Sequence, residues 1–173
     1  MDTTYESQRL ENLKHYEILD TPPDGTFDDF TSLASKMFNV PIAIISLVDS
    51  DRIWFKSAHG LDIDQVSKDP GLCASAILSD DDYIVKDAKV DPRSLSNPLV
   101  AGLMGFQFYA AAPLKSKEGF NLGTFCIIDR EPRSLSVEHT MMLRQLARMV
   151  INQLELRLQS RMLSKEFEAK SKN

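Results

Sequence analysis

The chain has 173 residues, of which 43% are hydrophobic and 26% are charged, and its formal net charge is −5. These values are typical of one globular domain, and a negative charge disfavours nucleic-acid binding, which needs a basic face. Two cysteines and three histidines without metal-ligand spacing predict neither a disulfide framework nor a metal site.

The first residues carry no basic region followed by an apolar core, which a signal peptide requires. No apolar run reaches the ~20 residues that span a membrane. We therefore expect a cytoplasmic protein that has no contact with a membrane.

Residues 4–20 repeat apolar side chains at helical spacing, and Asp20-Thr21-Pro22-Pro23 ends this helix because proline removes a backbone donor. A second helix begins near Thr26, which has the spacing of a capping box with Asp29. The sequence thus predicts an N-terminal helix within residues 1–22 that packs on a domain beginning at residue 23.

Residues 41–48 are apolar on both faces and rich in β-branched side chains, which favours a central strand covered on both sides. Residues 49–51 supply turn chemistry, and residues 52–57 predict the second strand of a hairpin. Acids such as Asp49 and Asp91 lie near arginines, so we interpret them as turn and ion-pair residues.

The middle of the chain is less regular. It predicts a short helix over residues 70–78 and a short strand over Tyr83–Val85. Residues 106–114 and 122–128 predict a second hairpin. Hairpins outnumber strand–helix crossovers, which favours an antiparallel sheet with helices packed on it.

A long final helix is predicted from Ser136, its N-cap, to at least Leu163. About 28 residues make a helix of roughly 42 Å, longer than the roughly 36 Å diameter of a core of this size. The helix should therefore continue past the domain, with an extension and polar tail over residues 157–173. Its apolar stripe predicts a homodimer contact formed by Leu143, Val150, Leu154, Leu158 and Met162.

Five segments in order resemble one family, the GAF domains found in bacterial sensor histidine kinases and diguanylate cyclases. They read ILDTPPDGTFDDFTSLAS, VPIAIISLVDSDRIWFKSAHGL, DPRSLSNPLV, FQFYAAAPL and LGTFCIIDREPRSLS. The resemblance implies an α+β fold over residues 23–156, with a central antiparallel sheet of five to six strands. The N- and C-terminal helices would lie on one face, and short helices and loops would enclose a pocket on the other.

The resemblance also implies a role in signal transduction, such as a two-component system, without catalysis. The domain would bind a small molecule or act as a dimeric signalling module, and a separate effector protein would receive the signal. The segments around the expected pocket predict a ligand site formed by Trp54, Phe55, Cys73, Ser75, Phe108, Tyr109 and Ala111.

Three positions depart from the family pattern. Ser75 replaces a common histidine, Ser94 an aromatic residue and Ala111 a glycine. The added methyl group at Ala111 should narrow the pocket. The signatures of bilin and cyclic-nucleotide binding are missing, so the sequence specifies no cofactor.

Two alternatives stay open. The chain could be a stand-alone thiol-dependent redox enzyme that uses Cys73, which lies near a predicted helix start. It could also be a purely structural dimerisation module whose pocket is filled.

Overall fold

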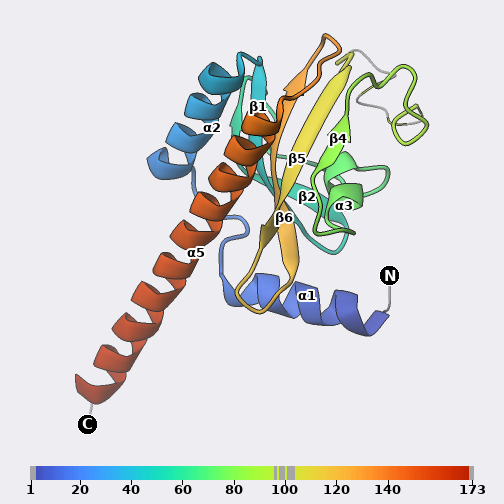
Figure 1. The fold of residues 1–173 in the computed structure, drawn as a ribbon. Coiled ribbons are helices and arrows are strands. Elements are labelled where there is room, and N and C mark those ends of the chain that lie inside the picture. Colours follow the sequence, from blue (N-terminus) through green and yellow to red (C-terminus); the bar gives the residue numbers. More distant parts are fainter. Residues whose placement is uncertain (1–2, 96, 98–99, 101–103, 172–173) are drawn as a thin grey trace.

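The structure is a computed structural model that describes residues 3–95, 97, 100 and 104–171 (Figure 1). Its helices are α1 (Thr3–His15), α2 (Gly25–Phe38), α3 (Leu72–Ala76) and α5 (Val137–Ser171). Its strands are β1 (Ile42–Val48), β2 (Arg52–His59), β3 (Gln65–Ser67), β4 (Tyr83–Val85), β5 (Phe108–Lys115) and β6 (Asn121–Asp129).

The described strands form one sheet in the order β3-β2-β1-β6-β5-β4, and every neighbouring pair is antiparallel. Both predicted hairpins are confirmed. β3 is an additional edge strand that the sequence did not predict, because three residues are too few to show an alternating pattern.

The helices lie as the predicted α+β fold requires, which confirms that fold. Figure 1 shows α2 and α5 side by side on one face of the sheet, which we call the helical face. α3 and loops cover the opposite face, which we call the cavity face. α1 runs across one end of the sheet, and its Leu13 joins the core of the helical face.

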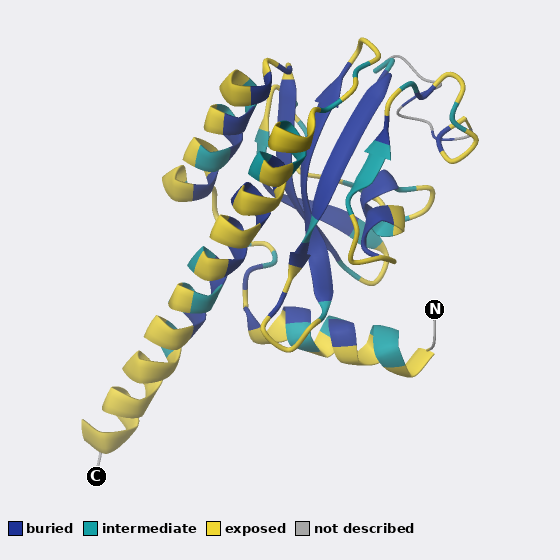
Figure 2. Ribbon diagram, in the orientation of Figure 1, coloured by how far each residue is buried: buried dark blue, intermediate teal, exposed yellow. Residues whose placement is uncertain are grey.

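Both faces of the central strands are buried (Figure 2). Every residue of β1 and β6 is buried, so successive side chains enter different cores. Ile45 and Phe125 pack against the helices. Ile44 and Cys126 belong to the core of the cavity face.

Side chains cap both long helices of the helical face. Asp24 caps α2, because its carboxylate accepts from the amide of Thr26 at 2.9 Å. The predicted cap at Thr26 is therefore wrong by two residues. Ser136 caps α5 as predicted and accepts from the amide of His139 at 3.1 Å.

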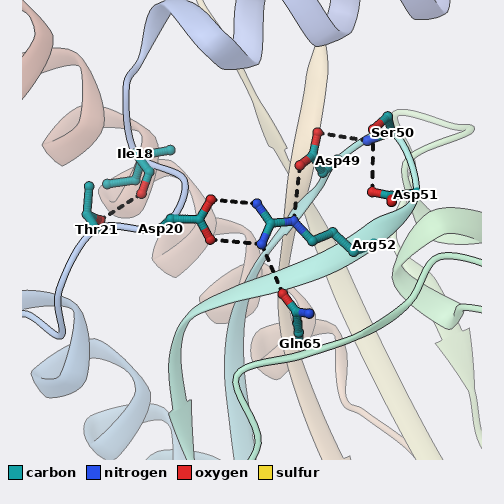
Figure 3. A network of polar contacts seen from close by, with 8 residues as sticks. All are labelled: Ile18, Asp20, Thr21, Asp49, Ser50, Asp51, Arg52 and Gln65. Atoms are coloured by element: carbon teal, nitrogen blue, oxygen red, sulfur yellow. Dashed lines mark hydrogen bonds and ion pairs between the residues drawn. The ribbon is translucent and has the colours of Figure 1, made fainter.

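The segment between α1 and α2 is fastened to the sheet by two basic residues. The Arg52 guanidinium binds both carboxylate oxygens of Asp20, at 2.8 and 2.7 Å, and also contacts Asp49 and Gln65 (Figure 3). Lys56 is the extra residue of a bulge, since Ile45 pairs with Ser57 and Ser46 with Phe55. Its ammonium donates to the hydroxyl of Thr21 at 2.9 Å and to the carbonyl of Pro22 at 2.7 Å.

α5 contains 35 residues and is therefore roughly 52 Å long. Its last buried residue is Leu158, and the helix continues for 13 residues to Ser171. Figure 1 shows this end projecting away from the sheet, as predicted from the length of the helix. Within the described residues, no helix is long and apolar enough to cross a membrane.

Candidate functional site

The cavity face encloses a small apolar cavity of about 30 Å³ between the sheet, α3 and the segment that contains β3. This volume is close to the ~30 Å³ that one water molecule occupies in the liquid. Apolar side chains form nearly all of its wall. The lining residues include Ile44, Ile53, Phe55, Leu61, Ile63, Leu72, Cys73, Phe106, Tyr109, Cys126 and Ile128.

Three of the predicted ligand residues, Phe55, Cys73 and Tyr109, line this cavity. Ala111 is fully buried in the same core, directly opposite Cys126 in the β5–β6 register, but it lies outside the cavity wall. Ser75 is exposed, and its hydroxyl donates to the carbonyl of Gly71 at 3.3 Å.

Trp54 and Phe108 lie on the wrong face for the predicted pocket. Both belong to the core of the helical face, on the side of the sheet away from the cavity. Their neighbours Phe55 and Tyr109 point the other way, because side chains alternate along a strand. Trp54 and Phe55 nevertheless both line a separate hollow of about 430 Å³, together with Lys56.

A polar cluster lies within the apolar core beside the cavity. The Tyr109 hydroxyl donates to Cys73 Sγ at 3.1 Å. The hydroxyls of Ser46 and Thr124 are 2.8 Å apart and occupy opposite positions on β1 and β6. Cys126 lies with Cys73 on the wall of the same cavity.

The pKa values of the two thiols shift in opposite directions. The interaction with Cys126 lowers the pKa of Cys73; burial opposes this, and the hydroxyls of Ser46, Thr124 and Tyr109 reinforce it. The same interaction raises the pKa of Cys126, and burial raises it further. Burial also raises the pKa of Tyr109, so this phenol stays protonated. Cys73 therefore accepts the hydrogen bond of the Tyr109 phenol.

The sequence prediction included Cys73 and Tyr109 but missed Cys126, Ser46 and Thr124. Cys126 is fully buried in the middle of β6, as a small core residue would be. A signal was nevertheless present, since Ser46 and Thr124 are hydroxyl residues inside two otherwise apolar strands. Two such hydroxyls facing each other in the register indicate a polar site inside the core.

The start of α3 is packed tightly on the sheet. A Cβ atom at Gly71 would lie 2.4 Å from Ile53 Cδ1 and 2.5 Å from the Lys68 carbonyl oxygen, so only glycine fits there. The side chain of Asn97 donates to the carbonyl of Pro70 at 3.0 Å. These contacts hold Cys73 against the strands.

The acids that the sequence marked as turn residues pair with arginines. Asp49 contacts Arg52 at 3.1 Å and Asp91 contacts Arg93 at 2.6 Å. Asp129 pairs with Arg133, and its other oxygen accepts from the backbone amide of Arg130. Among the described residues, no group of His, Cys, Asp or Glu is arranged to hold a metal ion.

The predicted dimer residues of α5 are mostly occupied within the chain. Leu143, Val150, Leu154 and Leu158 are buried in the core of the helical face, so their prediction as an intermolecular contact is wrong. They form the face of α5 that covers the sheet. Met162 alone of this set is exposed, at 48%.

A different apolar stripe of α5 faces outward. Met149, Leu156 and Leu163 are 47%, 60% and 57% exposed and follow each other at intervals of seven residues. On α2, Leu33 and Met37 are exposed as well. We call these five residues the α2–α5 surface.

The two parts of this surface belong to helices that lie antiparallel to each other. Phe38 at the end of α2 lies with its ring centroid 5.5 Å from that of His139 at the start of α5. Asp24 at the start of α2 pairs with Arg157 at 2.7 Å. Phe30 and Met142, which are partly buried, pack against the core shared by both helices.

Known proteins resemble the chain in sequence. The family model described as GAF domain matches residues 22–156. A cyclic di-GMP phosphodiesterase of Pseudomonas aeruginosa is 43% identical over 135 residues, which are 78% of this chain. The match spans only 23% of that protein's length.

Solved structures resemble it in fold. A free methionine-R-sulfoxide reductase of Neisseria meningitidis superposes with a TM-score of 0.65 at 17% identity, covering 90% of this chain and 91% of that one. A domain described as part of a two-component sensor histidine kinase protein of Sinorhizobium meliloti has a TM-score of 0.63 at 18% identity, covering 82% and 96%. At such identities, these likenesses concern the fold alone.

Proposed function

Because the chain belongs to the GAF domain family, we propose that it is a regulatory module that acts as a homodimer, in which α2 and α5 contact a second copy. The observation that carries this proposal is the α2–α5 surface, whose exposed apolar side chains run along both helices. Exposed apolar side chains that gather into one patch are typical of interaction sites.

The spacing of the stripe on α5 favours a second copy of the same helix as its partner. Met142, Met149, Leu156 and Leu163 recur every seven residues, the period with which helices pair in parallel coiled coils. In a parallel pair each of these side chains meets its own counterpart at the same height. The part of α5 beyond Leu158 would then extend the pair past the domain and pass its state to an effector protein.

The enclosed cavity by itself is too small for a metabolite-sized ligand, whereas two surface hollows of about 510 and 430 Å³ are lined by Ser75 and by Trp54 and Phe55, respectively. Ligand pockets measure ~300–1,000 Å³, and the cavity measures about 30 Å³. A ligand contact by Phe55, Cys73 and Tyr109 stays a prediction that would require α3 to move outward. A bound organic molecule in the native mass spectrum of the purified protein would establish that role.

Sedimentation velocity at tens of micromolar tests the dimer. We expect the wild type to sediment as a dimer and Leu156→Glu as a monomer, since a charge would then be buried at the contact. Met141→Glu is the matched control, because Met141 is also exposed on α5 but lies about 80° around the helix from Met149.

Both variants should keep the thermal stability of the isolated domain, because Leu156 and Met141 are more than half exposed. A monomeric wild type, or a Leu156→Glu variant that remains dimeric, would contradict the proposal.

A further inference from the structure

The two cysteines of the chain both lie on the cavity face although they are 53 positions apart in the sequence. Cys73 lies in the first turn of α3 and Cys126 in the middle of β6. Both belong to the same core cluster, and both line the same cavity. Neither forms a disulfide in the structure.

The surroundings of the pair distinguish the roles of the two sulfur atoms. Cys73 accepts from the Tyr109 hydroxyl, and the hydroxyls of Ser46 and Thr124 pair with each other inside the same part of the core. Donors around a sulfur atom stabilise its thiolate, which is the nucleophilic form. Cys73 is 7% exposed and Cys126 is 0% exposed. Cys73 is therefore the thiol that an oxidant reaches first.

The cavity restricts which oxidant can reach this thiol. A volume of about 30 Å³ holds a molecule of one or two heavy atoms, such as hydrogen peroxide. Organic hydroperoxides with bulky groups, amino-acid sulfoxides and glutathione are several times larger. They would have to displace α3, which Gly71 holds tightly on Ile53.

We propose that Cys73 and Cys126 are a peroxide-sensitive dithiol that hydrogen peroxide converts to an intramolecular disulfide, fastening α3 to β6. This modification site goes beyond the dimeric role proposed above and does not depend on it. Each pair of thiols would consume one peroxide and then stay oxidised until it is reduced again, so the site would not turn over a substrate.

The chemistry balances with peroxide as the only co-reactant. The Cys73 sulfur attacks one peroxide oxygen, the O–O bond breaks, and an S–O bond forms while the second oxygen leaves as water with the thiol proton. The Cys126 sulfur then attacks the Cys73 sulfur. The S–S bond forms, the S–O bond breaks, and the hydroxyl leaves as water with the Cys126 proton. Two thiols are oxidised and one peroxide is reduced to two waters.

The disulfide would change the packing of the cavity face. A disulfide requires the sulfur atoms to approach to about 2.05 Å, closer than any hydrogen-bonded contact. α3 has five residues and no side-chain cap, so the bond would pull Cys73 and this short helix toward the sheet against the close contact of Gly71 with Ile53. Phe125 and Ile127, the neighbours of Cys126 on β6, belong to the core beneath α2 and α5, which gives the oxidation a route to the helical face.

The test treats the reduced, folded protein with hydrogen peroxide, quenches it with a thiol-blocking reagent and records the intact mass. We expect the mass to fall by two hydrogen atoms per chain. Tryptic digestion without reduction should yield the peptides 69–86 and 118–130 joined through Cys73 and Cys126. Cumene hydroperoxide at the same concentration should react at least about tenfold more slowly, because the close-packed cavity does not admit it.

Two further variants separate this chemistry from general thiol oxidation. Tyr109→Phe keeps both cysteines and removes one donor to Cys73, so disulfide formation should slow by about threefold to tenfold. Cys126→Ser should stop at the sulfenic acid of Cys73, which a dimedone probe detects.

The proposal is overturned if the folded wild type gives Cys73 sulfinic acid without a cross-link, links only different chains, or stays reduced. It is equally overturned if cumene hydroperoxide reacts as fast as hydrogen peroxide, since oxidation would then follow unfolding. Tyr109→Phe, which retains both thiols, decides the question if Cys126→Ser does not fold.

Discussion

On the helical face, α2 and α5 cover the strands with 14 and 35 residues of helix, whereas α3 covers the cavity face with five residues and leaves the rest to loops. The core beneath the helices contains large apolar side chains such as Phe27, Phe108 and Phe125. The cavity face contains hydroxyls and thiols among its apolar residues. The chain thus concentrates its stability on one face and its reactive groups on the other.

The first prediction removes a large side chain from the core of the helical face. Phe125→Ala should lower the free energy of unfolding by about 3–5 kcal/mol, because this side chain is fully buried beneath the helices and leaves a cavity. Urea denaturation followed by circular dichroism measures the change. Leu72→Ala on α3 is the comparison variant and should cost only about 2 kcal/mol, since the short helix can settle into the space. Equal losses of unfolding free energy in Phe125→Ala and Leu72→Ala would show that the helical face and the cavity face contribute equally to stability.

The second prediction concerns how polar contacts hold the cavity face to α1. Arg9, which is fully buried, binds Glu6 through two hydrogen bonds and donates to the Val48 carbonyl, and Glu6 also pairs with Lys68 before α3. Glu6→Gln leaves the buried guanidinium without its counter-charge and should lower the free energy of unfolding by about 2 kcal/mol at pH 7.

This loss depends on pH in a defined direction. The Arg9 hydrogen bonds, against the effect of burial and with help from Lys68, lower the pKa of Glu6 from 4.5 to about 2. A carboxyl whose pKa is lower in the folded protein stabilises it above the unfolded pKa, and this contribution is lost as the pH falls. The difference between wild type and Glu6→Gln should therefore shrink from about pH 4.5 to about pH 2. A constant difference across that range would contradict the assigned role of Glu6.

The smallest effect on stability is expected for the surface ion-pair cluster around Arg52. Arg52 binds Asp20, Asp49 and Gln65 (Figure 3), yet the Asp20 carboxylate is exposed to solvent. Exposed ion pairs contribute little to stability. Asp20→Asn should leave the denaturation midpoint unchanged within error. A clear loss would mean that the segment between α1 and α2 depends on this contact more than on Lys56.

The sequence alone predicted the helices and strands whose apolar residues follow a regular pattern. β1, β6 and the long α5 follow from apolar runs and helical spacing, and the antiparallel order follows from the hairpins. The faces of the strands were harder to predict. Every residue of β1 and β6 is buried, so no polar alternation marks which side chain meets the helices and which the cavity. Trp54 and Phe108 were misplaced for the same reason, because β2 is buried over residues 53–57 and β5 over residues 108–112.

α5 shows a related limit. Its strongest apolar stripe, which contains Val150 and Leu154, was interpreted as a dimer seam, but a helix must first cover its own sheet. The weaker stripe of Met149, Leu156 and Leu163 is the one left exposed. Only the packing of α5 on the strands distinguishes these two stripes. The meeting of Cys73 with Cys126 likewise depends on where α3 lies.

A distance measured across the dimer tests the central claim most directly. Nitroxide labels at Glu166→Cys, in a Cys73→Ser and Cys126→Ser background, report the separation of the two α5 helices by pulsed electron resonance. The account predicts a narrow distribution below about 30 Å, because the axes of packed helices lie ~8–10 Å apart. An antiparallel pair that overlaps along the whole of α5 would place the labels roughly 36 Å apart along the helix axis, because Glu166 lies 12 residues from the midpoint of α5. Such a long distance, or no dipolar coupling, would contradict a parallel dimer built on α5.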